Sequence, residues 1–262
     1  MLDSSDTDSS SQKVAVYTAN FGNKDTLKSP KNLESLDSNR VDFVCVTDNA
    51  SFQSDVYQNL VVESTFGDIT KNARSIKING FDGMEDYDIA IWHDSSIQMD
   101  CDKINELISY AKEFSLSTFR HGREDVYLEA IACIETNKDR PVRIAQQMKR
   151  YHQSGLKAHS GLFETGIIVL NVKKFMGSEL QQAWWNEINH GSRRDQISLP
   201  YAEMVSNTKI GILEGSGHQN PYSEYIGHEY EHYIDSSNSW FSELNLLKKL
   251  AIRYIYKLRH RS

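Results

Sequence analysis

One segment in the middle of the chain ends an apolar run with residues that could bind a metal ion or a phosphate. Residues 89–92 are apolar, and the sequence "HDSS" over residues 93–96 follows with no turn residue between them. A carboxylate such as Asp94, held at the end of a buried strand, is a good ligand for Mg²⁺ or Mn²⁺, which takes its remaining ligands from water and phosphate oxygens. The usual short pattern for such a site is Asp-x-Asp. Because Ser96 stands at the third position here, the motif by itself is a weak signal.

Histidine could complete such a metal site. His218 lies in "GSGHQNPY", where the glycines would let a loop close over a ligand. His228 and His232 are four residues apart and could share one face of a helix, although each is by itself more typical of a surface histidine. The metal set that we expect is therefore Asp94, Ser96 and His218.

Strands and helices alternate through the first half of the chain, and these elements have to position the polar residues. The alternation favours an α/β fold with parallel strands, in which ligands bind beyond the carboxyl ends of the strands. The expected strands cover residues 13–21, 41–47, 58–64, 87–92 and 165–172, and the expected helices cover 68–79, 101–114, 124–137, 141–155 and 178–189.

Polar residues follow three of these strands at corresponding positions. They are Thr18 to Asn20 after the first strand, Asp48 after the second and Asp94 after the strand that opened this section. A single Asp after a strand is usually a turn residue or a helix cap. Three polar ends that converge on one edge of a sheet favour a ligand pocket, without naming the ligand.

Composition limits the class of protein. The chain has 262 residues, is 39% hydrophobic and carries a formal net charge of −7, which allows a sizeable core and argues against a dedicated nucleic-acid binder. Its three cysteines are far apart and indicate neither a disulfide framework nor a zinc site, so a reducing compartment is expected. No apolar run approaches the roughly 20 residues of a membrane span. The polar, acidic residues 1–12 are typical of a disordered leader and not of a signal peptide.

The last residues differ from the rest of the chain. Residues 247–262 carry six Lys or Arg and no Asp or Glu. One interpretation of residues 241–262 is a basic amphipathic helix that rests on anionic lipid. The other is a C-terminal helix packed on the domain with a solvated basic face. Apolar residues recur at helical spacing in either case, at Leu244, Leu247, Ala251, Tyr254 and Leu258.

Several segments in order carry a family resemblance. They are "VAVYTANFGNKD", "FVCVTDN", "NARSIKIN", "YDIAIWHDSSIQM", "GLFETGIIVLN" and "WWNEINHGSRRDQISLPYA". Over residues 13–235 the chain resembles the glycosyltransferase-like family of plant mucilage-related and turgor-regulation proteins and bacterial polysaccharide-locus proteins. It is similar more broadly to GT-A nucleotide-sugar transferases. The resemblance implies a GT-A-like, Rossmann-type mixed sheet flanked by helices, in a single domain over residues 13–240.

The resemblance also implies roles for the polar strand ends. Thr18, Ala19 and Asn20 would line the nucleotide pocket, and Asp48 would contact the base or the ribose. Arg74 and Lys77, one helical turn apart, would face the diphosphate or the donor sugar, as their spacing allows. Asp94 would stand at the metal or diphosphate position. The departure at Ser96 leaves metal dependence open.

Downstream segments would hold the donor sugar and the acceptor. Glu164 would place a carboxylate against sugar hydroxyls or the reacting carbon, and its alternative is an ordinary charge at a strand end. Asp195, in "RRDQ", would act as the general base that takes the acceptor proton, and its alternative is an ion pair that caps a helix. His121 and Arg123 would approach the donor or an anionic acceptor.

The function implied is a glycosyltransferase of the hexosyltransferase type. It would move a sugar from a nucleoside diphosphate donor, expected to be a UDP-sugar, to a glycan or a lipid-linked saccharide, with Mn²⁺ or Mg²⁺ as cofactor. We expect a cytoplasmic protein, peripheral at the inner face of the membrane, with no nucleic-acid partner. Two alternatives stay open: a metal-dependent hydrolase of the ceramidase type, and a non-catalytic module that binds nucleotide sugars or glycans. The lack of a second strong metal-ligand set argues against the hydrolase.

Overall fold

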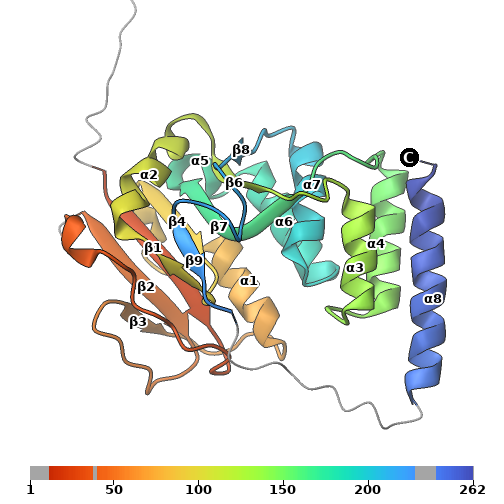
Figure 1. Cartoon of the computed structure of the whole chain (residues 1–262), viewed down its shortest axis with the longest axis horizontal. Coiled ribbons are helices and arrows are strands. Elements are labelled where there is room, and N and C mark those ends of the chain that lie inside the picture. The colour runs from red at the N-terminus through yellow and green to blue at the C-terminus, as the bar shows by residue number, and fades with distance from the viewer. Residues whose placement is uncertain (1–11, 38–39, 228–239, 262) are drawn as a thin grey trace, which may run out of the picture.

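The computed structural model describes residues 12–37, 40–227 and 240–261 (Figure 1). Its centre is a seven-stranded sheet in the order β3-β2-β1-β4-β7-β6-β8, and a separate two-stranded sheet joins β5 to β9. The strands are β1 (Val14–Asn20), β2 (Val41–Thr47), β3 (Gln58–Val61), β4 (Ile89–His93), β5 (Ile97–Met99), β6 (Leu116–Arg120), β7 (Phe163–Asn171), β8 (Gly211–Ile212) and β9 (Ser223–Tyr225). The helices are α1 (Ile69–Asn79), α2 (Ile104–Glu113), α3 (Val126–Glu135), α4 (Pro141–Gln153), α5 (Val172–Phe175), α6 (Glu179–His190), α7 (Asp195–Ser206) and α8 (Trp240–Arg259).

Strand β7 runs against its neighbours. It pairs antiparallel with β4 and with β6, whereas the β1–β2, β2–β3, β1–β4 and β6–β8 pairs are parallel. His93 at the end of β4 therefore pairs with Ile167, near the beginning of β7. The mixed sheet flanked by helices confirms the predicted α/β class. The reversal also brings residues that precede the core of β7 to the same sheet edge as Asp94.

Helices cover both faces of the sheet. On one face, Tyr17 and Trp92 of the sheet pack with Trp184 of α6 in a buried cluster that also includes residues of α1 and α7. On the other face, Ile91 and Phe119 belong to a cluster built with α2. The strands are buried on both faces because α1, α6 and α7 lie on one side and α2 with the β5–β9 ribbon on the other, as expected for parallel strands.

Two of the elements that the sequence expectations did not include lie next to the site. Helix α7 was not among the expected helices, and only the alternative for Asp195, an ion pair that caps a helix, implied one; Pro200 lies inside it, and proline disfavours a helix interior. Strand β6 was not expected either, since it has only five residues, among them the polar Ser117 and the charged Arg120. Both elements help to form the site described below, so more segments meet there than we expected from the sequence.

Helix α8 packs on the domain through one face. Ala251, Ile255 and Leu258 are buried in a cluster with residues of α3 and α4. Arg259 Nε donates to Asp125 Oδ2 at 2.7 Å, and Asp125 is the fully buried N-cap of α3. Figure 1 shows α3, α4 and α8 side by side at one end of the molecule, with α8 outermost.

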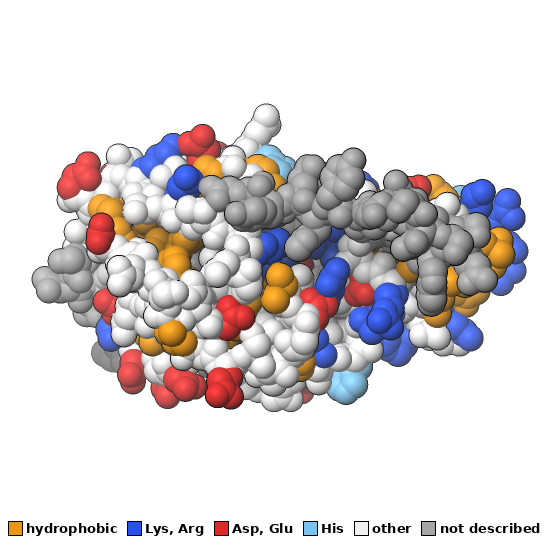
Figure 2. All heavy atoms as spheres, turned by 90° about the horizontal axis from the view of Figure 1, so that it is seen from below, with side chains coloured by type: hydrophobic (Ala, Val, Ile, Leu, Met, Phe, Trp, Pro, Cys, Tyr) orange, Lys and Arg blue, Asp and Glu red, His pale blue; other side chains and the backbone are white. Residues whose placement is uncertain are grey.

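The outer face of α8 is partly apolar. Leu246, Leu247, Leu250 and Tyr254 are exposed, although the spacing placed Leu247 and Tyr254 with the buried residues. In Figure 2, blue Lys and Arg side chains and orange hydrophobic ones lie together at this end, while most red Asp and Glu side chains lie over the opposite half. Among the described residues, no helix has both the length and the apolar composition to span a bilayer.

Candidate active site

A cleft of about 1660 Å³ opens where β4 ends, β7 begins and α7 starts. The chain direction explains the location: Asp94 N donates to Gly166 O at 2.8 Å, which ties the end of β4 to the beginning of β7. Ten residues singled out in the sequence line the cleft: Ala19, Asn20, Arg74, Asp94, Ser96, His121, Arg123, Glu164, Asp195 and His218.

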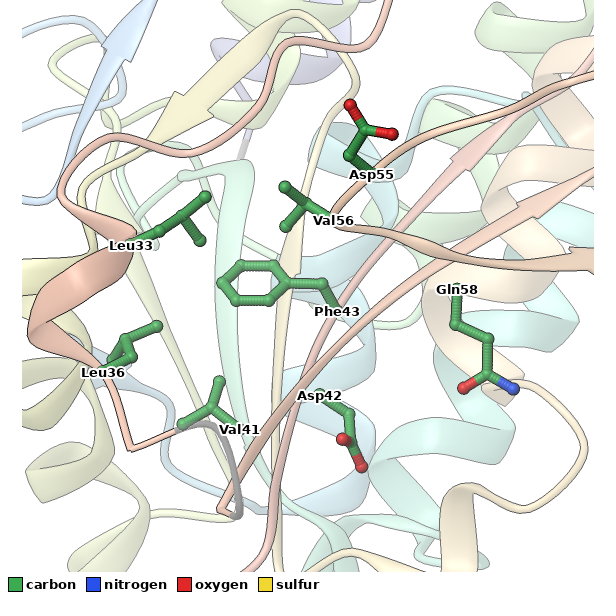
Figure 3. Close-up of a pocket in the computed structure, with 8 residues that line it drawn as sticks. All are labelled: Leu33, Leu36, Val41, Asp42, Phe43, Asp55, Val56 and Gln58. Atoms are coloured by element: carbon green, nitrogen blue, oxygen red, sulfur yellow. The ribbon is translucent and has the colours of Figure 1, made fainter.

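A second hollow, of about 370 Å³, lies beside β2 and away from these residues (Figure 3). Leu33, Leu36, Val41 and Val56 surround Phe43 there, and the hollow shares no residue with the large cleft. It lacks the concentration of charged side chains found in the large cleft, which is therefore the candidate active site.

Four charged side chains form a cluster at the floor of the cleft, which we call the charged quartet: Arg74, Lys77, Asp94 and Asp195. Lys77 Nζ lies 2.6 Å from Asp195 Oδ2 and 3.3 Å from Asp94 Oδ1. Arg74 Nη1 lies 3.2 Å from Asp94 Oδ1, and Arg74 Nε lies 3.1 Å from Asp195 Oδ2. Two cations thus each contact both carboxylates, and the formal charges of the quartet cancel.

The quartet is held by the elements around it. Arg74 and Lys77 lie one turn apart on α1, whose N-cap Asp68 accepts hydrogen bonds from the N–H groups of Thr70 and Lys71. The side chain of Lys77 is fully buried and that of Arg74 is 12% exposed. A buried cation is costly unless it is paired, so both side chains depend on the carboxylates for their position.

Asp94 is the most accessible member of the quartet. Its side chain is 30% exposed, and Oδ1 also accepts a hydrogen bond from Trp92 Nε1 at 2.9 Å. Burial raises the pKa of Asp94, but the attraction of Lys77 and Arg74 outweighs burial, so its pKa lies below the usual value. Asp94 is therefore an ionised carboxylate with one heavily engaged oxygen.

Asp195 is the deepest carboxylate of the quartet. It is the first residue of α7 and is only 1% exposed. Its Oδ2 also accepts from Thr165 Oγ1 at 2.8 Å, whereas Oδ1 is buried with no hydrogen-bond partner among the described residues. Burial raises its pKa, but Arg74, Lys77 and Arg194 bring the pKa far below the usual value.

Three of the predicted site residues do not line the cleft. Lys77 lies beneath it, and Thr18 is fully buried in β1. Asp48 is exposed and connects two loops instead, since it accepts from Gly22 N at 2.9 Å and from Ser64 Oγ at 3.0 Å. The structure thus brings together the residues after β1 and β4, but the residue after β2 lies outside the cleft.

Glu164 and His218 both belong to the cleft wall. Glu164 Oε2 accepts a hydrogen bond from the backbone N–H of Gly217. A Cβ atom at Gly217 would meet that oxygen, so a larger residue there would displace the Glu164 carboxylate. The ring of His218 stands edge-on to Tyr225, with centroids 4.8 Å apart. Glu164 therefore fixes the loop that carries His218. His228 and His232 lie outside the described residues.

A family model described as "TOD1/MUCI70, glycosyltransferase-like domain" matches residues 1–213. The chain belongs to this family. The match covers the sheet, the charged quartet and helices α1 to α7. It confirms the resemblance that the ordered segments carried. Comparison with curated protein sequences finds no match.

Solved glycosyltransferase structures are similar to this family member at low sequence identity. Mouse xyloside xylosyltransferase 1, in its apo form, shares 8% identity with a TM-score of 0.43, over 77% of this chain and 84% of its own. Galactosyltransferase LgtC, in complex with donor and acceptor sugar analogues, shares 10% identity with a TM-score of 0.44, over 90% of this chain and 95% of its own. The glycosyltransferase GlyE of Streptococcus pneumoniae TIGR4 shares 10% identity with a TM-score of 0.41, over 94% of this chain and 63% of its own.

The residues at Asp94 are a poor fit to the divalent cation that the resemblance implies. Asp94 Oδ1 already accepts from three donors, and two of them are cations. Within the described ranges, no three His, Cys, Asp or Glu side chains are grouped so that they could share a metal ion. A divalent cation at Asp94 would lie next to Arg74 and Lys77 and be repelled by both. The metal set of Asp94, Ser96 and His218 stays a prediction that this charge arrangement does not favour.

The sequence missed two cations that line the cleft, Lys24 and Lys138, which we call the lysine pair. Lys24 follows β1, and Lys138 lies in the turn between α3 and α4. Neither ammonium has a hydrogen bond or an ion pair with a described residue. Both residues lie in turns without a recognisable motif, so nothing in the sequence marked them.

Proposed function

We propose that the protein is a glycosyltransferase that moves a sugar from a UDP-sugar to a glycan or lipid-linked saccharide. The observation that carries the proposal is the combination, in a glycosyltransferase-like domain, of a large cleft with a charged quartet at its floor. Ligands of α/β folds bind at this edge of the sheet. The cleft also has the polar lining that a nucleotide and two sugars require.

In this proposal the donor lies along the edge formed by β1 and β4. Ala19 and Asn20 line the nucleotide end, and Asn20 is fixed because its Nδ2 donates to Asp25 O at 2.7 Å. Arg74 faces the diphosphate and offsets the negative charge that grows on it as the bond to the sugar breaks. Asp94 holds Arg74 in place and faces the donor with its exposed edge.

The free oxygen of Asp195 suits a sugar hydroxyl. Because Oδ1 lacks a partner among the described residues, a hydroxyl that donates to it would satisfy a buried acceptor. The strongly lowered pKa makes Asp195 a weak base. We therefore assign it first to sugar positioning, with the general-base role as the alternative. Glu164 also lines the cleft, and we assign it to the side from which the acceptor hydroxyl would approach.

An assay of UDP release tests the proposal. The purified chain is incubated with a panel of UDP-sugars, with and without mixed oligosaccharides, and UDP and glycan products are measured. We expect UDP release that depends on one donor and rises with acceptor, together with an acceptor heavier by one sugar. Asp195→Asn should lower turnover more than donor binding if the general-base role holds. UDP release without any transfer product would indicate a hydrolase, and no reaction with any donor would contradict the proposal.

We also propose that the protein is cytoplasmic and rests on an anionic membrane through α8. The support is the exposed apolar side chains at Leu246, Leu250 and Tyr254, on a helix that also carries exposed Lys249 and Arg253. Apolar contact and attraction to anionic lipid act together in such helices. Co-sedimentation with phosphatidylserine vesicles at low salt should retain the protein, and Leu246→Ser with Leu250→Ser should release it. Lack of binding by the unmodified chain would refute this proposal.

A further inference from the structure

Most charged side chains that line the cleft are paired within the protein, including the arginines Arg123 and Arg193. Each carboxylate of the lining is engaged by the protein through at least one oxygen. Asp94 and Asp195 are paired within the quartet, Asp25 Oδ2 accepts from Ser95 Oγ at 2.5 Å, and Glu164 binds the backbone of Gly217. Little negative charge is therefore left over to attract a cation.

The lysine pair differs from these residues. Lys24 and Lys138 both line the cleft but come from different segments, one after β1 and one from the turn that ends α3. Among the described residues, neither ammonium lies within ion-pair distance of a carboxylate, although the protein as a whole is acidic. Unpaired cations that face a cleft next to Arg74 favour an anionic ligand with two or more negative charges.

The pKa of Lys24 is affected by residues of the charged quartet and by Lys138. Burial is the largest effect that lowers its pKa. Repulsion from Arg74 and Lys138 acts in the same direction. Asp25 and Asp94 act against it. Lys24 thus lies within electrostatic reach of the quartet and of Lys138, and a bound anion would relieve the repulsion among the three cations.

We propose that Lys24 and Lys138, together with Arg74, bind the diphosphate of the donor, and that this binding needs no divalent cation. The proposal rests on the proposed transferase function and adds the identity of the diphosphate site. The cations take the place that a metal ion has in a site with free carboxylates: they neutralise the phosphate oxygens and the charge that develops on the leaving group. Asp94 then acts as a positioning residue, which orients Arg74.

Calorimetric titration tests the proposal on the full chain in EDTA, with UDP and inorganic pyrophosphate as probes. We expect both to bind, and we expect Mn²⁺ to leave the dissociation constant of UDP within about twofold. Lys24→Ala and Lys138→Ala should each weaken binding about tenfold, since each removes a charged contact to phosphate. Lys149→Ala, an exposed lysine of α4 outside the cleft, is the matched control and should bind as the unmodified chain does.

The outcomes separate this inference from the function on which it rests. UDP binding that requires Mn²⁺, or that is unchanged in both lysine variants, would overturn the lysine site. Binding of pyrophosphate that depends on both lysines, with UDP no tighter than pyrophosphate, would support the anion site and count against a nucleotide-sugar donor. No binding of either probe would overturn the anion site itself. Lys24→Arg should restore most of the affinity, which a merely structural role of Lys24 would not predict.

Discussion

The charged quartet and the lysine pair lie in the same cleft, but their charges are balanced differently. Each cation of the quartet contacts both carboxylates within 3.3 Å, and three of the four side chains are nearly or fully buried. Neither ammonium of the lysine pair lies within ion-pair distance of a carboxylate among the described residues, and Lys138 is exposed. Balanced charges fix the geometry of the site, whereas unbalanced ones leave binding capacity for a ligand. Stability should therefore depend on the first group, and ligand affinity on the second.

Removal of Lys77 should have the largest effect on the stability of the folded protein. Lys77→Met leaves Asp195 buried without its nearest cation, and breaking a buried ion pair typically costs about 3–5 kcal/mol. Urea denaturation should show a loss of this size in the free energy of unfolding. Adding Asp195→Asn should recover part of the loss, because the uncompensated charge is removed. A Lys77→Met protein as stable as the unmodified chain would mean that the quartet does not support the fold.

Removal of Asp94 should affect turnover more than stability. Asp94→Ala frees Arg74 and Trp92 from their common acceptor, and we expect turnover to fall by roughly 100-fold or more, as for other groups that organise charge in an active site. The measurement is UDP release under saturating donor. Asp82→Ala changes an exposed carboxylate in the loop before β4, at the opposite sheet edge, and should keep full activity. Full activity in Asp94→Ala would remove Asp94 from the site.

Acid should weaken the quartet. The pKa values of Asp94 and Asp195 lie below the ordinary 3.8 in the folded protein, so near and below pH 3.8 the unfolded chain binds more protons. Their stabilisation is fully present above this pH and is lost as the pH falls through the folded-state pKa values. The slope should approach about 1.4 kcal/mol per pH unit for each carboxylate. Asp195→Asn should reduce the slope of the free energy of unfolding against pH. Asp55→Asn, which changes an exposed carboxylate, should leave this slope unchanged.

Changes to the lysine pair should have the smallest effect on stability. Lys24→Met and Lys138→Met should alter the free energy of unfolding by no more than about 0.5 kcal/mol, because neither ammonium has a hydrogen bond or an ion pair with a described residue that the change would break. Because the folded-state pKa of Lys24 is lowered, any change should be a slight gain below its pKa. Urea denaturation checks this. A large destabilisation by either variant would show that the pair supports the fold and would remove the contrast with the quartet.

Much of this site could be predicted from sequence, for physical reasons that differ by residue. Asp94 is marked by the abrupt end of an apolar strand, and Arg74 and Lys77 by their spacing on one helix face; the structure brings all three together with Asp195. Their catalytic and binding roles remain predictions. The lysine pair could not be predicted, because both lysines lie in turns and their approach depends on tertiary packing.

The direction of β7 could not be predicted from the sequence either. Alternating strands and helices indicated parallel pairing, which holds for β1 to β4. The apolar pattern of a buried strand, however, is the same whether the strand runs parallel or antiparallel to its neighbours. Its reversal places Thr165 and Glu164 at the carboxyl edge of β4, although they stand at the beginning of their strand. Helix α7 was hidden by Pro200, which its buried surroundings tolerate.

The pair between Lys77 and Asp195 joins residues that are 118 positions apart. During synthesis, α1 leaves the ribosome long before α7, and the ammonium of Lys77 has no buried carboxylate from α7 to receive it. A nascent chain that ends before Asp195 would have to keep this lysine in water and α1 away from its final place. We therefore expect the active site to form late and in one step, so that a prematurely terminated chain has no partly formed cleft with which to capture a nucleotide.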